Sequence, residues 1–537
     1  MTVPQSCNPA RPPVSRFMRA RGGNVAMMFG LLLVPICLAV FASIDFYRAS
    51  VERSNLQDAL DAAALVAART QSDDPDVIQR VGVAALQAGL ANAEGIRLLT
   101  DQTRFTPDDG RVVAEAAVQV SPWVLGLFRH PGLITTAQSQ IVRGQTNVEV
   151  AMVLDVTGSM NESSGGVSKI ARLREAATAL VNTLEQSSQG SSDPNAVRIS
   201  MVPFSASVNV GAANRNAPWI VNNATHQISN QLFTNNGTAP VNTNRFVLLN
   251  QIGAPWGGCV ESRPEPFDVT DTQPTSGQPL TMFVPYFAPD EPGAGDGFTL
   301  QDYNAGLWYY NDYLPDDTGS TDRRVMQGRP GKYDQPPSIT GQTLAGTGYN
   351  YGPNFGCLTS TIVPLTTNFS ALRNSIAALT AAGDTNIPLG AMWGWHTLAP
   401  GAPFNNATAY GNPDVRKIMI IMTDGNNTYA DVASPNHNRS MYTSLAYIGQ
   451  GRLGITNGTA AQRTARMDQR LAQLCRNMRD RGVTVYTVRV EVSDGSSDVL
   501  RNCATEQANY YDVQNAAQLT DVFRSIAGSI TRMRIAH

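Results

Sequence analysis

The chain has 537 residues, of which 42% are hydrophobic and 15% are charged, and its formal net charge is −3. The length exceeds that of one ordinary domain, and the composition is that of a globular protein with a polar surface, not of a multi-pass membrane protein. The small negative charge gives no reason to expect nucleic acid as a partner. Five scattered histidines without ligand spacing argue against a histidine-based zinc site.

The chain begins with a basic segment and a long apolar run. Residues 1–23 carry four arginines and no acidic residue, and residues 25–44 contain no charged side chain. A helix of about 20 apolar residues spans the hydrocarbon core of a bilayer, so we predict one transmembrane helix over residues 24–45. Because arginines stay in the cytoplasm, the N-terminus is expected inside and the rest of the chain outside. A cleaved signal peptide is the alternative, although its apolar core is usually shorter, about 7–15 residues.

The cysteine pattern fits an exported protein. Two cysteines fall in the predicted tail and span, whereas the other four fall in the predicted exported part. An oxidising compartment allows two disulfides among these four. We favour Cys259–Cys357 and Cys475–Cys503, because each pair closes a local loop. Four buried free thiols are the alternative.

The region after the predicted span has the pattern of a helix followed by a sheet. Helical spacing of Leu and Ala continues through residues 46–70, and a second helix is expected to start near Asp76, after an interruption at residues 73–75. Residues 110–120 alternate in polarity, with valines and alanines on one face, and together with residues 133–144 they predict a strand pair. A long helix followed by a small sheet resembles the arrangement in pilins.

From residue 147 onward, apolar strands alternate with amphipathic helices. This alternation predicts an α/β fold with a mostly parallel sheet covered by helices on both faces. In such folds ligands bind at the carboxyl ends of the strands, where the loops gather. The expected strands are residues 147–155, 196–205, 415–425, 482–492 and 509–513, and the expected helices are residues 168–186, 374–381, 387–398, 460–480 and 515–530, with a short one near Asp498.

A long insertion interrupts the alternation. Residues 206–360 are rich in Asn, Gly, Pro, Asp and Tyr, and a connection of this length is uncommon in a compact domain unless it is functional or disordered. Its aromatic residues argue against pure disorder, so we expect a partly ordered insertion that either binds a partner or covers one side of the domain. These aromatics are Tyr303, Trp308, Tyr309, Tyr310 and Tyr313.

Oxygen-bearing side chains follow two of the expected strands and precede one of the expected helices. In a parallel sheet the three loops that carry them rise at the same edge. Carboxylates, hydroxyls and waters suit Mg2+, with Mn2+ or Ca2+ as alternatives, and the uncharged hydroxyls leave the ion with positive charge for a partner's carboxylate. Ordinary turn and cap residues are the alternative interpretation. The candidate metal ligands are Asp155, Thr157, Ser159, Thr385 and Asp424.

This constellation resembles the metal-ion-dependent adhesion site (MIDAS) of von Willebrand factor type A domains. The family pattern is Asp-x-Ser-x-Ser after the first strand, a distant Thr, and an Asp after a later strand. All three parts are matched, with Thr157 in place of the more usual serine, and the resemblance covers about residues 147–205 and 361–535. It implies a doubly wound type A fold, a divalent metal held by the five residues, and a protein ligand that supplies a carboxylate.

Other segments resemble proteins of tight-adherence pili. Residues 21–49 and 55–68 resemble the N-terminal segment of TadE/TadG-like Flp pilus-assembly proteins, and residues 256–264, 286–292 and 510–530 resemble the TadG members that carry a type A domain. The resemblance implies a role in Flp pili, a single-pass anchor in the bacterial inner membrane, a metal site in the periplasm, and no enzymatic activity. The expected organisation is a cytoplasmic basic tail (1–23), a transmembrane helix (24–45), a TadE/TadG-like helix with a small sheet (46–146), and a type A domain (147–537) with its insertion (206–360).

The expected functions differ in where the metal site acts. An assembly factor stays tethered through residues 24–45 and binds a carboxylate of a pilus or envelope protein. An adhesin, released by cleavage near Ala42, would use the same site and the tyrosine-rich insertion to bind a foreign ligand; an uncleaved anchor favours the assembly factor. An enzyme is not expected, because residues 328–334 (GRPGKYD) lack the spacing of a phosphate loop, and neither a GxSxG elbow nor a Cys–His pair stands out.

Overall fold

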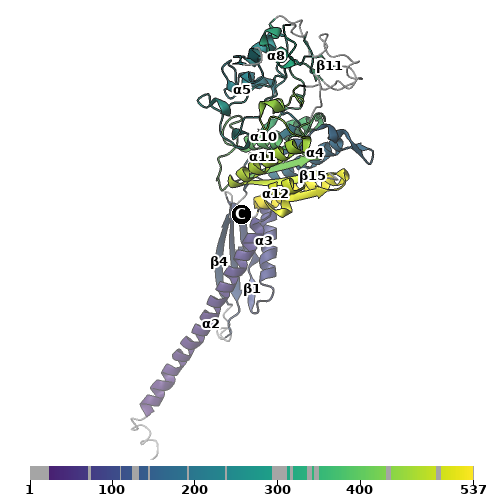
Figure 1. Ribbon diagram of the computed structural model, residues 1–537. Coiled ribbons are helices and arrows are strands. Elements are labelled where there is room, and N and C mark those ends of the chain that lie inside the picture. The colour runs from purple at the N-terminus through teal and green to yellow at the C-terminus, as the bar shows by residue number, and fades with distance from the viewer. Residues whose placement is uncertain are drawn as a thin grey trace, which may run out of the picture. The chain divides into compact units, whose positions relative to one another are not determined.

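The contacts within the chain divide it into two compact units, Met1–Gly144 and Gln145–His537. Figure 1 labels their main helices and strands. Residues 1–22 of the predicted cytoplasmic tail, including Cys7, lie outside the described residues. The computed structural model describes residues 23–70, 74–108, 111–123, 132–142, 146–189, 191, 193–235, 239–292, 311–314, 319–334, 342–343, 350–430, 437–491 and 497–535.

The first unit is organised around one long helix, α2 (Gly23–Ala68). This helix confirms that the apolar run continues without a break into the region that follows it. Among the described residues, Met28–Ala68 is the one helix that is long and apolar enough to cross a membrane, and only 6% of its most apolar window is buried. It contains most of the predicted span.

A second helix and a four-stranded antiparallel sheet complete this unit. β3 is the central strand: β1 and β2 pair with one side of it and β4 pairs with the other. The expected β3–β4 pair is therefore confirmed, with Ala116 opposite Ala137. Asp74 accepts a hydrogen bond from the amide of Asp76 and starts the second helix one residue before its predicted position. These elements are α3 (Pro75–Gly89), β1 (Ile96–Leu98), β2 (Arg104–Asp108), β3 (Arg111–Val120) and β4 (Leu133–Val142).

The second unit is built on a six-stranded sheet in the order β13-β8-β5-β14-β15-β16. Every neighbouring pair is parallel except β13–β8, which is antiparallel, so this unit is a mixed α/β structure with a mostly parallel sheet. β13 falls where no strand was predicted, because its four residues include a proline and carry little strand pattern. The strands are β5 (Asn147–Asp155), β8 (Val197–Phe204), β13 (Val363–Thr366), β14 (Val415–Thr423), β15 (Val483–Val490) and β16 (Tyr510–Val513).

Helices pack on both faces of this sheet. One buried cluster joins one face to α4, α9 and α13, and a second cluster joins the other face to α10, α11 and α12. α10 lies very close to the sheet, since a Cβ added to Gly394 would stand 2.4 Å from Val153 Cγ2. The helix predicted at 374–381 is wrong in position: it starts earlier, where Asn368 accepts a hydrogen bond from the amide of Ala371. The helices are α4 (Lys169–Ser188), α9 (Phe369–Ala377), α10 (Ile387–Leu398), α11 (Ala460–Asp480), α12 (Ser497–Cys503) and α13 (Leu519–Ile535).

The described part of the insertion forms an ordered layer over α10. In Figure 1, α5 and α8 lie beyond α10, on the side away from β15. Aromatic contacts join this layer to the helix, with the ring centroids of Phe283 and Trp393 4.6 Å apart. Tyr313 is buried and donates to the carbonyl of Ala288, whereas the other four predicted aromatics lie outside the described residues. The short elements of the second unit are β6 (Ser163–Ser164), β7 (Val167–Ser168), α5 (Gln227–Asn230), β9 (Thr234–Asn235), β10 (Ala239–Pro240), α6 (Arg245–Gln251), α8 (Arg323–Gly328), β11 (Gln342–Thr343) and β12 (Asn350–Tyr351).

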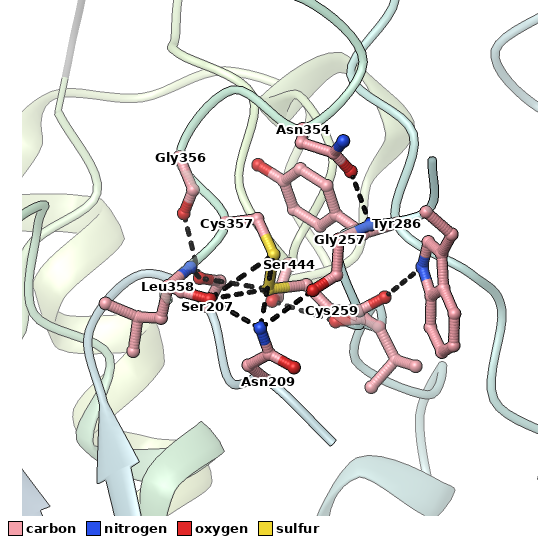
Figure 2. Close-up of a disulfide and its surroundings, with 12 residues drawn as sticks. Ser207, Asn209, Gly257, Cys259, Tyr286, Asn354, Gly356, Cys357, Leu358 and Ser444 are labelled. Atoms are coloured by element: carbon pink, nitrogen blue, oxygen red, sulfur yellow. Dashed lines mark hydrogen bonds between the residues drawn. A yellow bond between two sulfur atoms is a disulfide. The ribbon is translucent and has the colours of Figure 1, made fainter. Parts of the chain in front are cut away.

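Both favoured disulfides are confirmed. Cys259–Cys357 joins two loop segments of the insertion, with its Cα atoms 5.7 Å apart, and Cys475–Cys503 joins α11 to α12. Figure 2 shows the first disulfide among hydrogen bonds that tie Asn209 to the carbonyls of Gly257 and Leu358. The disulfide therefore joins the middle of the insertion to its end, and the hydrogen bonds of Asn209 tie both to its start.

Candidate functional site

The first part of the candidate site follows β5. This strand is apolar and almost wholly buried until it ends in Asp155, whose side chain is fully buried. The carboxylate does not cap a helix: its Oδ1 accepts the amide hydrogen of Thr157, which turns the chain away from the sheet, 2.8 Å between the two atoms. The Thr157 and Ser159 hydroxyls then lie 3.0 Å from each other. The alternating acid and hydroxyls therefore face a common point.

The end of β14 supplies the second part. β14 lies beside β5 in parallel register, with Met422 opposite Leu154, so the two strands end at the same level. Thr423 donates to Asp155 Oδ2 over 2.6 Å. Ser159 donates to Asp424 Oδ1 over 2.7 Å, which closes a chain of hydrogen bonds between the two loops.

The third loop, which carries Thr385, is hydrogen-bonded to both of the others. The amide of Gly158 donates to the carbonyl of Gly383 over 2.9 Å, which ties this loop to the first one. The amide and the carbonyl of Thr385 both bond to Thr428, just past Asp424. Thr385 Oγ1 also lies 3.6 Å from the position that a Cβ on Gly425 would occupy. The structure thus brings all five predicted residues to one edge of the sheet.

The electrostatics of this edge are those of two crowded acids. Burial, together with repulsion from Asp424, raises the pKa of Asp155 to about 7. Lys169, at the start of α4, donates to Asp424 Oδ2 over 3.0 Å and to Glu162 over 2.8 Å. Burial works against the charge of Lys169, but these two carboxylates outweigh it and raise the pKa of the ammonium group. Lys169 therefore supplies one positive charge at a place with two buried acids.

The residues present fit a hard divalent cation. Their donors are carboxylate and hydroxyl oxygens, the ligands that Mg2+ and Ca2+ prefer. Ser205, directly after β8, adds a buried hydroxyl without a hydrogen-bond partner among the described residues, and its Oγ lies 3.2 Å from the position of a Cβ on Gly383. Within the described ranges, no group of three or more His, Cys, Asp and Glu side chains is placed to hold a metal, so the hydroxyls are essential to any such site.

Three residues of this edge were not predicted as part of the site: Lys169, Ser205 and Thr423. Thr423 immediately precedes Asp424 and was predicted as a residue of the strand, with no role for its hydroxyl in the site. Lys169 and Ser205 lack any sequence signal, because each reaches the site through the fold and not through motif spacing.

Comparison with protein families bears on the N-terminal helix. The family of TadE/G-like Flp pilus-assembly proteins matches residues 23–70, which are the whole of α2 and the two residues after it. This segment is TadE/G-like. The match agrees with the resemblance of residues 21–49 and 55–68.

Solved structures give weaker likenesses to this chain. The von Willebrand factor domain of the type V pili tip protein Mfa5 from Porphyromonas gingivalis is 12% identical, with a TM-score of 0.31 over 73% of this chain and 97% of that one. The pilus adhesin SpaC from Lactobacillus rhamnosus GG is 10% identical, with a TM-score of 0.31 over 82% of this chain and 35% of SpaC, so this chain spans about a third of SpaC. Proximal thread matrix protein 1 from the mussel byssus, with zinc in its MIDAS motif, is 11% identical, with a TM-score of 0.19 over 72% of this chain and 96% of that one. No curated protein matches the chain.

Proposed function

We propose that this protein is a membrane-anchored, metal-dependent binding factor for the assembly or anchoring of Flp pili. The TadE/G-like segment supports the association with pili, and the apolar helix supports a membrane anchor. In this proposal residues 24–45 cross the bacterial inner membrane, the basic tail stays in the cytoplasm, and the chain from residue 46 onward lies in the periplasm. Two disulfides in the second unit fit an oxidising compartment.

The observation that carries the metal-binding part is the hydrogen-bonded chain that links Asp155 to Asp424 through Thr157 and Ser159. In this proposal the second unit is a von Willebrand type A domain, and this chain, with Thr385, is its MIDAS. Bound Mg2+ would supply a Lewis-acidic position for a carboxylate of the partner. The loops hold the acids and hydroxyls in place before the ion arrives, since each is already fixed by backbone or side-chain hydrogen bonds.

The proposed activity is binding and not catalysis. The partner is a pilus or envelope protein that presents an Asp, a Glu or a C-terminal carboxylate. Hydrolysis of phosphoesters by the purified, Mg2+-loaded protein, lost in Asp155→Ala, would contradict this part of the proposal.

A pull-down from pilus-producing cells tests the function. Full-length wild type and Asp155→Ala, both tagged, are purified in detergent with Mg2+ or with EDTA. The proposal predicts a pilus or envelope protein that is captured by wild type with Mg2+ and lost with EDTA or with the variant. A partner captured equally under all four conditions would contradict a role for the metal site.

The second candidate function, a released adhesin, makes a different prediction about the N-terminus. Cleavage near Ala42 would remove most of the apolar run at residues 25–44 and free the rest of the chain, whereas the assembly factor keeps this run. Mass spectrometry of the protein isolated from cells distinguishes the two: an intact α2 supports the assembly factor, and a mature N-terminus just after Ala42 supports the adhesin.

A further inference from the structure

A polar cavity between the insertion and residues 437–457 shares no residue with the candidate metal site. Its volume is about 430 Å3, and it is lined by residues of α8 and β9 and by the segment 437–457. This volume falls in the range of sites for small molecules. Among the described residues of its lining no side chain is acidic, and two of them, Arg324 and Arg439, are cationic. The cavity therefore favours an anionic ligand.

The charged side chains of the two arginines are not part of the ion pairs that hold the described residues together. Both are exposed at the cavity, and neither guanidinium forms an ion pair with a carboxylate within the part of the chain that the structure describes. The nearby carboxylate of Asp322 already accepts the amide hydrogen of Arg324 at the start of α8. Arg439 has a φ of 55°, and its carbonyl is held by buried Arg463 over 2.9 Å. The backbone of both arginines is therefore fixed while their charges stay available.

The lining of the cavity includes buried polar atoms that have no hydrogen-bond partner among the residues that the structure describes. These atoms are both ring nitrogens of His437 and the side-chain oxygen of Gln450. Folded proteins pair almost all of their buried polar atoms, so three such atoms in one cavity indicate a place where a ligand supplies the hydrogen bonds. Burial and the charges of Arg323 and Arg324 lower the pKa of His437 to about 4, so the ring is neutral at pH 7 and offers one donor and one acceptor.

The rest of the cavity is preorganised by amide contacts. Gln327 of α8 and Asn438 exchange two side-chain hydrogen bonds, of 2.9 and 3.3 Å, which hold the two sides of the cavity together. The hydroxyl of Tyr447 donates a hydrogen bond to Glu291 over 2.7 Å, which fixes the position of this side chain. The side-chain oxygen of Gln231 accepts a hydrogen bond from Arg452 Nε over 3.2 Å. Amide groups in fixed positions suit hydroxyl groups of a ligand, which both donate and accept.

We propose that this cavity binds an acidic sugar, that is, a saccharide unit that carries a carboxylate or a sulfate. The two arginines pair with its anionic group, and the amides, His437 and Gln450 bond to its hydroxyls. A nucleotide fits less well, because Leu232 and Tyr447 in the lining are both almost fully buried and leave little surface on which a base could stack. The proposal is independent of the metal site.

Binding of defined sugars to the full-length protein in detergent tests this inference. The probes are glucuronate, N-acetylneuraminate and N-acetylglucosamine 6-sulfate, with neutral galactose and inorganic sulfate as comparisons, all measured by calorimetry or by ligand-observed NMR in EDTA. The expected result is binding of at least one acidic sugar with a Kd below about 10 mM, tighter than that of galactose and of inorganic sulfate. Charged hydrogen bonds predict a loss of about tenfold or more in Arg324→Gln and in Arg439→Gln.

Matched variants separate the cavity from general charge effects. Arg524→Gln removes an exposed arginine of α13 that pairs only with Asp521, and it should leave binding unchanged. Gln450→Leu removes a buried acceptor without changing charge and should also weaken binding, while Asp155→Ala should not. The inference is overturned if no acidic sugar binds, if inorganic sulfate binds as tightly as every acidic sugar, or if both cavity arginine variants, melting at the wild-type temperature, bind as wild type does.

Discussion

Replacing Lys169 by methionine should tighten the binding of Mg2+. The ammonium lies 3.0 Å from Asp424 Oδ2 and so occupies the place of a cation beside the candidate site. An ion held about 2.1 Å from a carboxylate oxygen would lie roughly 5 Å from this ammonium. Charges of +1 and +2 at that distance repel each other by about 1.7 kcal/mol even with the full dielectric constant of water, which is a factor of about 15 in affinity.

The loss of the ammonium also affects the metal-free protein. Asp424 would then lie beside Asp155 without its counter-charge, so the metal-free variant should melt at a lower temperature than the metal-free wild type. Saturating Mg2+ should recover most of this difference, because the ion replaces the missing charge.

The assay is calorimetric titration of Mg2+ into the full-length protein, with thermal melts in EDTA and in Mg2+. Arg172→Met is the matched control: it removes a cation from the same helix that pairs with Glu175 and not with the site, so its affinity should equal that of wild type. Mg2+ affinity in Lys169→Met that is equal to or weaker than wild type would refute the reasoning, and would indicate that Lys169 positions Asp424 for the ion instead of competing with it.

Three other predictions concern the fold. Breaking Cys475–Cys503, which closes a loop of 28 residues, should lower stability by about 3–4 kcal/mol and lower the melting temperature; an identical melt with and without reductant would argue against any role of the disulfides. Gly394→Ala should destabilise the fold by about 1–3 kcal/mol in chemical denaturation, because the new methyl group would clash with Val153. Gly528→Ala on α13 is the control: the nearest atom is 3.6 Å away, so this change should be neutral or stabilising. Burial and the adjacent Arg263 lower the pKa of His396 well below 6.5. The unfolded chain therefore takes up a proton first, and stability falls as the pH drops below 6.5, by at most about 1.4 kcal/mol per pH unit. In urea unfolding at several pH values, His396→Gln should remove this part of the dependence of stability on pH, and an unchanged dependence would contradict the prediction.

Sequence patterns predicted the elements whose signal is local. β5 has a long apolar run, and four of the five candidate ligands lie at or just after the ends of β5 and β14, so the meeting of these four at one edge followed from parallel pairing. The disulfides could be predicted because export was expected for this part of the chain and each pair closes a loop within one region of it.

Contacts between distant segments could not be predicted in the same way. Lys169 pairs with Asp424 across 255 positions of sequence, and no spacing rule links the two. The insertion has weak periodicity, because its order comes from aromatic packing, such as Phe283 on Trp393, and from buried polar bonds. β13 was missed for a related reason: four residues at the edge of a sheet are held by pairing with β8 and not by their own pattern.

The most direct test of the account is whether the two acids at the edge of the sheet hold a divalent ion. Asp155→Asn keeps the shape of the side chain and removes its charge, so the fold should persist while the ion loses a carboxylate ligand. Calorimetric titration of the full-length protein should show one Mg2+ bound per wild-type chain and at least about a tenfold loss of affinity in Asp155→Asn. Equal Mg2+ affinity in the two proteins, or no Mg2+ binding by the folded wild type, would contradict it.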